Sequence, residues 1–307
     1  MRLIKPNFWN KRNIISFLLY PLTIITHSIN LFKIIFLKKN FIIKTICVGN
    51  IYIGGTGKTS LAIAINKILS TKFKTVFIKK NYKNQQDEIN LLKKNGTVIT
   101  AKNRKNSLTK AEKNKFEVAI LDDGLQQKNI NFDLKIVCFN SYDGLGNGLV
   151  LPAGPLRENI SQLKKYDIAL LNGENRNYKL KSKLKSINKK LEIFEGKYVA
   201  TNLNEFDRNK KYLMFCGIGN PHEFEKTLIK YKFIIKNKRI YPDHFKISLN
   251  EIRKLKTIAK KQRLNLITTE KDFLRIKKQE RKNIKFLKVD LKINNIKKLK
   301  YNLITKL

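Results

Sequence analysis

The sequence predicts an α/β protein: a doubly wound parallel sheet, a second, smaller α/β domain and an N-terminal membrane-associated helix. Short apolar strands alternate with segments of helical periodicity, an order typical of parallel sheets whose helices cross between strands. A glycine-rich loop joins the first strand to the first helix. Because phosphate-binding loops occupy that position, the larger domain is expected to be P-loop NTPase-like.

The larger domain is expected over residues 41–200. Its strands are expected at residues 42–50, 75–80, 117–124, 133–140 and 167–173, which are short and mainly apolar. A helix is expected at residues 60–69, where apolar residues recur at helical spacing. The polar stretch at residues 173–209 has no long apolar run and is interpreted as a junction between domains.

The smaller α/β domain is expected over residues 201–307. Residues 211–231 repeat the order of strand, glycine turn and helix, and residues 264–276 add a strand with a polar end. The chain has 307 residues, of which 42% are hydrophobic. A chain of that length and composition can bury the cores of two such domains.

The N-terminal region, residues 1–40, contains an uncharged stretch from residue 13 to residue 32 between basic flanks. Its apolar face at helical spacing consists of Ile14, Phe17, Leu18, Pro21, Leu22, Ile25, Ile29, Phe32 and Phe36. Pro21 is expected to interrupt the helix. This pattern favours a helix lying in a membrane interface; the alternative is an amphipathic helix packed on the protein's own core. No small-residue cleavage site follows, so an ordinary signal peptide is not expected.

The formal net charge is +42, from 65 Lys and Arg against 23 Asp and Glu. Such an excess favours anionic partners, such as a membrane surface, a phosphorylated substrate or nucleic acid. The lysines are scattered along the chain, however, so a general residue bias explains the charge equally well. Cys47, Cys138 and Cys216 stand singly in apolar runs, so neither a disulfide framework nor a structural zinc site is expected.

The glycine-rich loop VGNIYIGGTGKTS covers residues 48–60. Its glycines allow backbone N–H groups to face a phosphate. Lys58 is placed to reach the β- and γ-phosphates of ATP, and the Thr59 hydroxyl to hold Mg²⁺. Tyr52 stands where a standard motif has its first glycine, so a longer variant of the loop is expected. The expected nucleotide-binding residues are Tyr52, Ile53, Gly54, Gly55, Thr56, Gly57, Lys58 and Thr59.

Two adjacent acids, Asp122 and Asp123, end an apolar strand in the sequence LDDGLQ. Ligands of doubly wound sheets gather at the carboxyl ends of the strands. Adjacent acids are costly there unless a cation compensates them. The pair therefore predicts a Walker B-like magnesium site; the alternative is an aspartate that only caps the next element.

Two further motifs are candidates for the acceptor side of the site. The loop DGLGNGLVLPAGPLRE, residues 143–158, ends in Arg157 and Glu158 and is expected to line a substrate cleft. The sequence YPDHF places Asp243 beside His244. An aspartate and a histidine together can act as a general base, although this spacing also fits a structural pair.

These motifs, together with CGIGNPHEF at 216–224 and TTEKD at 268–272, closely resemble the tetraacyldisaccharide 4′-kinase (lipid A 4′-kinase) family. The resemblance covers nearly the whole chain. It implies transfer of the ATP γ-phosphate, with Mg²⁺, to the 4′-hydroxyl of an acylated disaccharide 1-phosphate. It also implies two partners, the lipid substrate and an anionic membrane surface, at the cytoplasmic face of the bacterial inner membrane. Nucleic acid is not expected as a partner.

The resemblance also implies roles for single residues. His244 and Asp87, the latter in the sequence QDE, match the family's histidine and aspartate near the accepting hydroxyl. The other catalytic candidates are Lys58, Asp122 and Glu158. The candidate metal ligands are Thr59, Asp123 and Glu88.

The chain departs from the family pattern in places. KKNYKNQ, residues 79–85, replaces an SRGYGG-like stretch, Gln86 replaces a glycine, and Gln127 stands where the family often has histidine. Two other functions compete with the kinase. The net charge alone suggests a nucleic-acid-associated P-loop ATPase, but no clustered basic stripe or aromatic stacking motif accompanies it. The altered KKNYKNQ stretch suggests a non-catalytic nucleotide-binding membrane protein.

Overall fold

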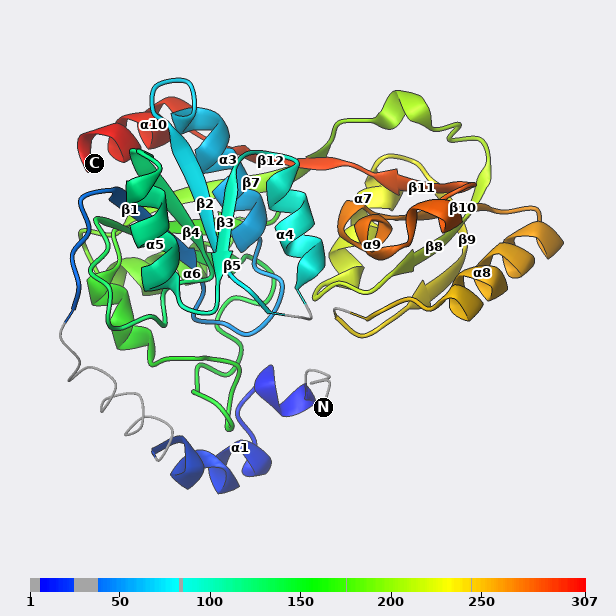
Figure 1. Cartoon of the computed structure of the whole chain (residues 1–307). Helices are drawn as coiled ribbons and strands as arrows, with labels where there is room; N and C mark the ends of the chain where they lie inside the picture. Colours follow the sequence, from blue (N-terminus) through cyan, green and yellow to red (C-terminus); the bar gives the residue numbers. More distant parts are fainter. Residues whose placement is uncertain (1–5, 25–37, 83–84, 175, 244) are drawn as a thin grey trace. The chain divides into compact units, whose positions relative to one another are not determined.

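The computed structural model describes residues 6–24, 38–82, 85–174, 176–243 and 245–307 (Figure 1). The chain forms two compact units. The larger unit is drawn from residues 5–81, 95–197 and 291–307, and the smaller from residues 82–94 and 198–290. The expected boundary near residue 200 lies close to one of these limits. The units are not contiguous in sequence, however, because residues 82–94 group with the smaller unit and residues 291–307 with the larger.

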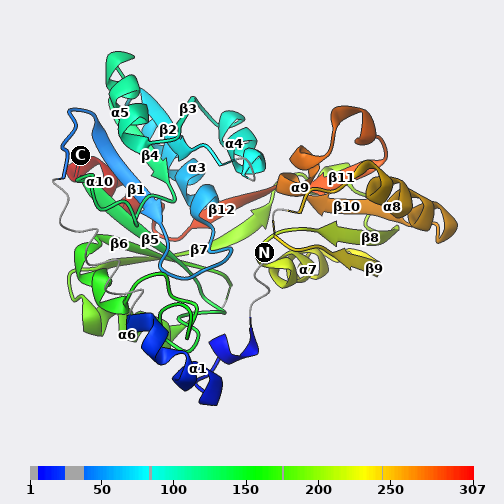
Figure 2. The same ribbon diagram turned by 60° about the horizontal axis from the view of Figure 1, so that its bottom comes forward.

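The larger unit is built on an eight-stranded sheet in the order β12-β7-β6-β5-β1-β4-β2-β3 (Figure 2). Its strands are β1 (Lys44–Gly49), β2 (Thr75–Lys80), β3 (Val98–Ala101), β4 (Val118–Asp122), β5 (Leu134–Asn140), β6 (Ile168–Asn172), β7 (Glu192–Ala200) and β12 (Val289–Ile293). The pairs from β3 to β7 along this order are parallel. Strand order reverses beside β1, as in other doubly wound sheets, so the predicted doubly wound α/β sheet is confirmed.

Helices accompany these strands. They are α3 (Lys58–Leu69), α5 (Arg104–Lys113), α6 (Tyr178–Ile187) and α10 (Ile296–Thr305), with short turns η1 (Asn7–Trp9) and η2 (Ile160–Lys165). Of these helices, α3, α5 and α6 lie between strands along the chain. Leu108 of α5 and Leu184 of α6 belong to one core cluster with the sheet. The connections that contain α5 and α6 lead along the sheet away from β3, whereas the β1–α3–β2 connection leads toward β3. Because such crossovers are right-handed, α3 lies on the other face.

The smaller unit contains a four-stranded sheet in the order β11-β10-β8-β9, paired in parallel throughout. Its strands are β8 (Lys211–Cys216), β9 (Ile234–Ile240), β10 (Asn265–Thr269) and β11 (Ile284–Leu287). Its helices are α4 (Gln86–Lys93), α7 (Pro221–Lys230), α8 (Leu249–Lys261) and α9 (Glu270–Arg275), with turns η3 (Leu203–Glu205) and η4 (Lys278–Glu280). Met214 packs with Leu228 of α7, and its neighbour Leu213 with Leu255 of α8. Alternate residues of β8 thus serve two cores.

The stretch at residues 173–209 is more than a domain junction, which corrects the interpretation of its polar sequence. It contains α6 and β7. Leu180 and Leu184 are the buried residues of α6, and β7 pairs with β6. Two buried leucines one helical turn apart are enough to attach a helix that is otherwise lysine-rich.

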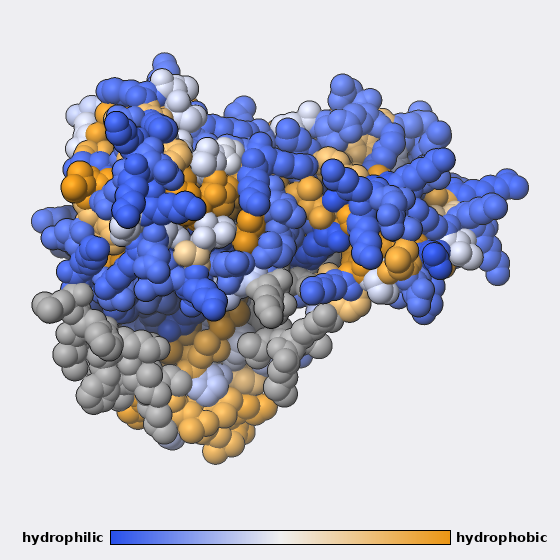
Figure 3. Space-filling model, viewed as in Figure 1, coloured by the Kyte–Doolittle hydropathy of each residue, from blue (hydrophilic) through white to orange (hydrophobic). Residues whose placement is uncertain are grey.

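The N-terminal region exposes apolar side chains. Helix α1 (Ile14–Leu18) begins with a capping box between Asn13 and Ser16. It ends before Pro21, and residues 20–24 are again helical. Ile14, Phe17 and Leu18 are 66–78% exposed, and hydrophobic surface gathers at this end of the molecule (Figure 3). The remainder of the expected apolar face, from Ile25 onward, lies outside the described residues. Within the described residues, no helix is long and apolar enough to cross a membrane.

Candidate functional site

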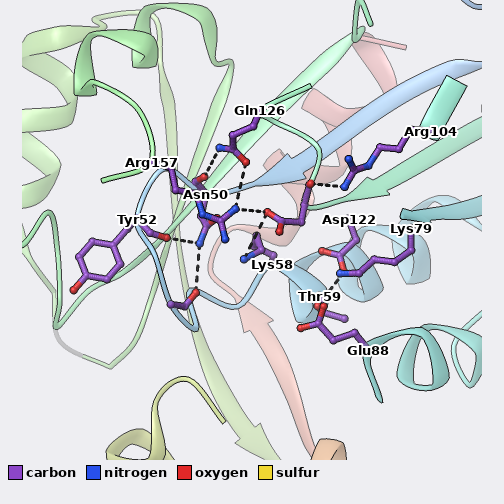
Figure 4. A network of polar contacts seen from close by, with 12 residues as sticks. Asn50, Tyr52, Lys58, Thr59, Lys79, Glu88, Arg104, Asp122, Gln126 and Arg157 are labelled. Carbon is purple, nitrogen blue, oxygen red and sulfur yellow. Dashed lines mark hydrogen bonds and ion pairs between the residues drawn. The ribbon is translucent and has the colours of Figure 1, made fainter. Parts of the chain in front are cut away.

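The glycine-rich loop connects β1 to α3 in the larger unit, as the sequence predicts. Gly54 and Gly57 have φ angles of +131° and +88°, which a residue with a Cβ rarely adopts. Inside the loop, the Asn50 side chain donates to the backbone carbonyls of Tyr52 and Gly54 (Figure 4). The Asn50 side chain therefore fixes the shape of the loop directly before the start of α3, a position where backbone N–H groups can bind an anion.

A second loop, residues 143–158, braces the glycine-rich loop. Ile53 donates its N–H to Pro155 O at 2.9 Å, and Arg157 donates its N–H to Ile51 O at 2.6 Å. The same second loop holds the N-terminal region, because the Trp9 indole donates to Pro152 O at 3.2 Å. Residues 143–158 therefore form an ordered loop against the glycine-rich loop, and their expected place along a substrate cleft stays a prediction.

Asp122, the last residue of β4, is fully buried. Its Oδ2 accepts hydrogen bonds from the Thr59 hydroxyl at 3.0 Å and from Lys79 Nζ at 2.7 Å (Figure 4). Its Oδ1 has no hydrogen-bond partner among the described residues. Lys79, at the end of β2, is 1% exposed. A buried carboxylate is tolerated here because a buried ammonium group compensates it.

Asp123 is the meeting point of several cations. Its Oδ1 lies 3.0 Å from the Arg157 guanidinium and 3.8 Å from Lys58 Nζ. Its backbone carbonyl accepts a hydrogen bond from Arg104 at 2.6 Å. The φ angle of Asp123 is +61°, a conformation that costs free energy for a residue other than glycine. These contacts hold the strained turn in place after β4.

Glu158 has a different setting from the two aspartates. Its Oε2 lies 3.1 Å from Lys128 Nζ and accepts a hydrogen bond from the Tyr166 hydroxyl at 3.4 Å. Burial, together with the Glu158 carboxylate, raises the pKa of Tyr166, so the phenol remains a donor. Within the described part of the chain, Glu158 pairs with neither Lys58 nor Arg157, so its contacts do not attach it to the glycine-rich loop.

Asp87 lies in the smaller unit, in the first turn of α4, and is 3% exposed. Its carboxylate is 2.7 Å from the Arg275 guanidinium. Arg275 also contacts Asp272 Oδ1 and Gly217 O, each at 2.6 Å. Three separate motifs, QDE, CGIGN and TTEKD, therefore meet around one arginine. The neighbouring carboxylate of Glu88 pairs with Lys271 at 2.7 Å, and His244 lies outside the described residues.

Sequence reasoning missed three cations of these clusters: Lys79, Arg104 and Arg275. Lys79 is the last buried residue of β2 and lies at the same edge of the sheet as Asp122, so the rule that selected the aspartates also applied to it. Arg275 lies three residues after Asp272, one helical turn along α9. Nothing in the sequence around Arg104 indicates its contact with Asp123.

The comparison with protein families is decisive for the whole chain. The model of the LpxK family, tetraacyldisaccharide-1-P 4′-kinase, matches residues 15–307. The chain belongs to this family. The resemblance drawn from the ordered motifs is therefore confirmed, and the nucleic-acid-associated ATPase is not favoured.

Individual members of the tetraacyldisaccharide-1-P 4′-kinase family are similar over nearly their full length. The chain is 46% identical to a tetraacyldisaccharide 4′-kinase of Pelagibacter ubique over 308 residues, covering 99% of this chain and 98% of the relative. It is 34% identical to that of Rickettsia bellii, covering 96% of each chain. The crystal structure of LpxK from Aquifex aeolicus in complex with ATP superposes with a TM-score of 0.72 at 22% identity, covering 95% of this chain and 99% of that one. The last comparison supports the fold.

Proposed function

We propose that this kinase transfers the ATP γ-phosphate to the 4′-hydroxyl of a tetraacyldisaccharide 1-phosphate. Membership of the tetraacyldisaccharide-1-P 4′-kinase family carries the proposal. The geometry of the larger unit supports it, because Lys58 and Thr59 begin a helix directly after a glycine-rich loop. Such a helix start presents backbone N–H groups and a positive dipole end to a phosphate.

Binding of ATP is assigned to the loop from Tyr52 to Thr59. Lys58 would neutralise charge on the transferred phosphoryl group, which is the main way in which P-loop enzymes stabilise their transition states. Arg157, beside Asp123, adds a second positive charge at the same place. The Aquifex aeolicus structure, solved with ATP, supports the choice of nucleotide.

The residues present also fit a magnesium ion. The Thr59 hydroxyl donates a hydrogen bond to Asp122, which leaves the lone pairs of the hydroxyl oxygen available to a cation. The buried Oδ1 of Asp122, without a hydrogen-bond partner in the described structure, can accept from a water ligand of the ion. When bound, Mg²⁺ would neutralise phosphate charge. Glu88 pairs with Lys271, so Thr59 and Asp122 fit the role better than Glu88.

Asp87 and His244 are proposed to receive the proton of the acceptor hydroxyl. Arg275 holds the Asp87 carboxylate in an ion pair at 2.7 Å, which fixes the position of that carboxylate. Asp87 is therefore better suited to orient and charge-stabilise a histidine, and His244 is the better candidate for the base itself.

The place of action is proposed to be the cytoplasmic surface of the bacterial inner membrane. The exposed apolar residues of α1 suit insertion into the interface. An excess of lysine suits anionic headgroups. The acylated substrate would be presented at that surface.

A direct assay tests the proposed function. Purified full-length protein is incubated with Mg²⁺, ATP labelled at the γ-phosphate, and the tetraacyldisaccharide 1-phosphate in mixed micelles. We expect label to appear in the lipid, and to be absent when the acceptor already carries a 4′-phosphate. Release of labelled phosphate to water, with none in the lipid, would overturn the proposal in favour of an ATPase.

A further inference from the structure

A small pocket in the larger unit combines an apolar floor with a rim of lysines. Its volume is about 70 Å³. The floor consists of the buried side chains of Leu125, Ile130, Phe132 and Tyr166. The rim carries Lys38, Lys128, Lys135 and Lys165. None of these residues belongs to the glycine-rich loop.

The lysines of the rim repel one another. Glu158 offsets one of the charges, because its carboxylate lies 3.1 Å from Lys128. Burial and the charge of Lys128 lower the pKa of Lys165, and Lys38 and Lys135 act in the same direction. Gathering like charges beside an apolar surface costs free energy in the empty protein. An anion in the pocket would remove that cost.

The size and lining of the pocket select the kind of anion. Pockets for whole drug-sized ligands have volumes of about 300–1,000 Å³, so a pocket of about 70 Å³ suits a phosphate group and is too small for a nucleotide. Inorganic phosphate would leave the apolar floor in contact with water, so the floor would contribute little to the free energy of binding. A phosphate that carries hydrocarbon would remove more of that apolar surface from water and would bind more tightly.

We propose that this pocket binds the phosphate group of a lipid, at a site separate from the glycine-rich loop. Lys38 supports this choice, because it belongs to the same N-terminal region whose apolar side chains are exposed at residues 14–24. Two sources share this chemistry: the phosphodiester of an anionic phospholipid, and the phosphomonoester that the acceptor lipid already carries. The second source rests on the proposed kinase function, and the first does not.

Calorimetric titration with soluble short-chain lipids tests the site without ATP and without turnover. The probes are dihexanoyl phosphatidylglycerol, a phosphodiester, and dihexanoyl phosphatidic acid, a phosphomonoester, with inorganic phosphate for comparison. The test variant is K38Q/K165Q, which neutralises two exposed lysines of the rim. The control is K179Q/K183Q, which makes the same charge change on the exposed surface of α6. Phosphate bound at the glycine-rich loop contributes equally to all three proteins and cancels.

We expect the rim variant to bind its preferred lipid at least about tenfold more weakly than wild type, since each lysine near an anionic lipid contributes about 1 kcal/mol. The control is expected to bind like wild type. Preference for the phosphodiester would indicate a membrane headgroup, and preference for the phosphomonoester the acceptor lipid. Equal weakening by both variants, or lipids that bind no better than inorganic phosphate, would overturn the proposal. Neither result would touch the phosphoryl-transfer assay, so the two proposals fail independently.

Discussion

Lys58 is the residue on which the proposed chemistry depends most. Replacing it with alanine is expected to reduce turnover by at least about 10²-fold, because it removes a preorganised positive charge facing the phosphates. Within the described structure its side chain makes a single, loose ion pair, at 3.8 Å from Asp123, so the fold should survive. The measurement is kcat with circular dichroism alongside. The control is Lys67→Ala, an exposed lysine on the same helix. More than about a tenth of wild-type activity in the Lys58 variant would count against the P-loop assignment.

Lys79 is expected to contribute to the stability of the fold by compensating the buried charge of Asp122. Lys79→Met leaves Asp122 buried with an unpaired charge, which should cost about 3–5 kcal/mol of unfolding free energy. Adding Asp122→Asn should restore part of that loss, because the double variant buries no unpaired charge. Denaturant unfolding measures both, with Lys72→Met as an exposed control. A single variant as stable as wild type would show that the pair at 2.7 Å contributes nothing.

Asp272 gives the smaller unit a pH dependence. Burial raises its pKa, while the Arg275 charge and hydrogen bonds from Thr269 and Gly217 oppose the rise. A carboxyl group whose pKa is higher in the folded state stabilises the fold below its unfolded pKa of about 3.9. That stabilisation is lost as pH rises through the folded pKa. We therefore expect the free energy of unfolding of wild type to fall, relative to that of the Asp272→Asn variant, as the pH rises from acidic values. A difference that stays constant, or changes in the opposite sense, contradicts this.

Helix α1 is the element whose exposed apolar side chains best suit contact with a membrane. Phe17 and Leu18 are 66% and 73% exposed, so replacing both with serine should cost little stability. It should weaken flotation with vesicles, because burying each such side chain contributes about 1.5–3 kcal/mol. The matched control replaces Ile42 and Ile229, which lie outside α1 and are 94% and 59% exposed, with serine. If both variants float alike, α1 is not the membrane-contacting element.

The elements that could be predicted from sequence are those whose burial is continuous. β1, β4 and β6 are buried along nearly their whole length, and their apolar runs are visible in the sequence. β7 and β12 were missed because exposed and half-exposed residues interrupt them. The grouping of α4 with the smaller unit could not be predicted either, because it depends on contacts with residues that are far away in the sequence. Tertiary contact, such as that of Asp87 with Arg275, leaves no local pattern.

At the scale of the whole molecule, the net charge of +42 and the apolar surface of α1 should act on membranes in separable ways. Raising the ionic strength from about 0.01 M to 1 M shortens the Debye length from about 30 Å to about 3 Å. Binding to vesicles that contain phosphatidylglycerol should therefore weaken strongly with salt, whereas binding to phosphatidylcholine vesicles should change little. A protein attached to the membrane only through its charge would not bind at high salt.

The combined experiment distinguishes the two contributions. Wild type should retain binding to phosphatidylglycerol vesicles at about 1 M salt, because insertion of apolar side chains is not screened. The variant with serine at positions 17 and 18 should bind more weakly than wild type at low salt, where its lysines still attract the anionic lipid, and should lose binding at high salt. If the salt dependence were the same for both proteins and both lipids, the lysines would have no part in membrane contact. The charge would then reflect residue bias alone.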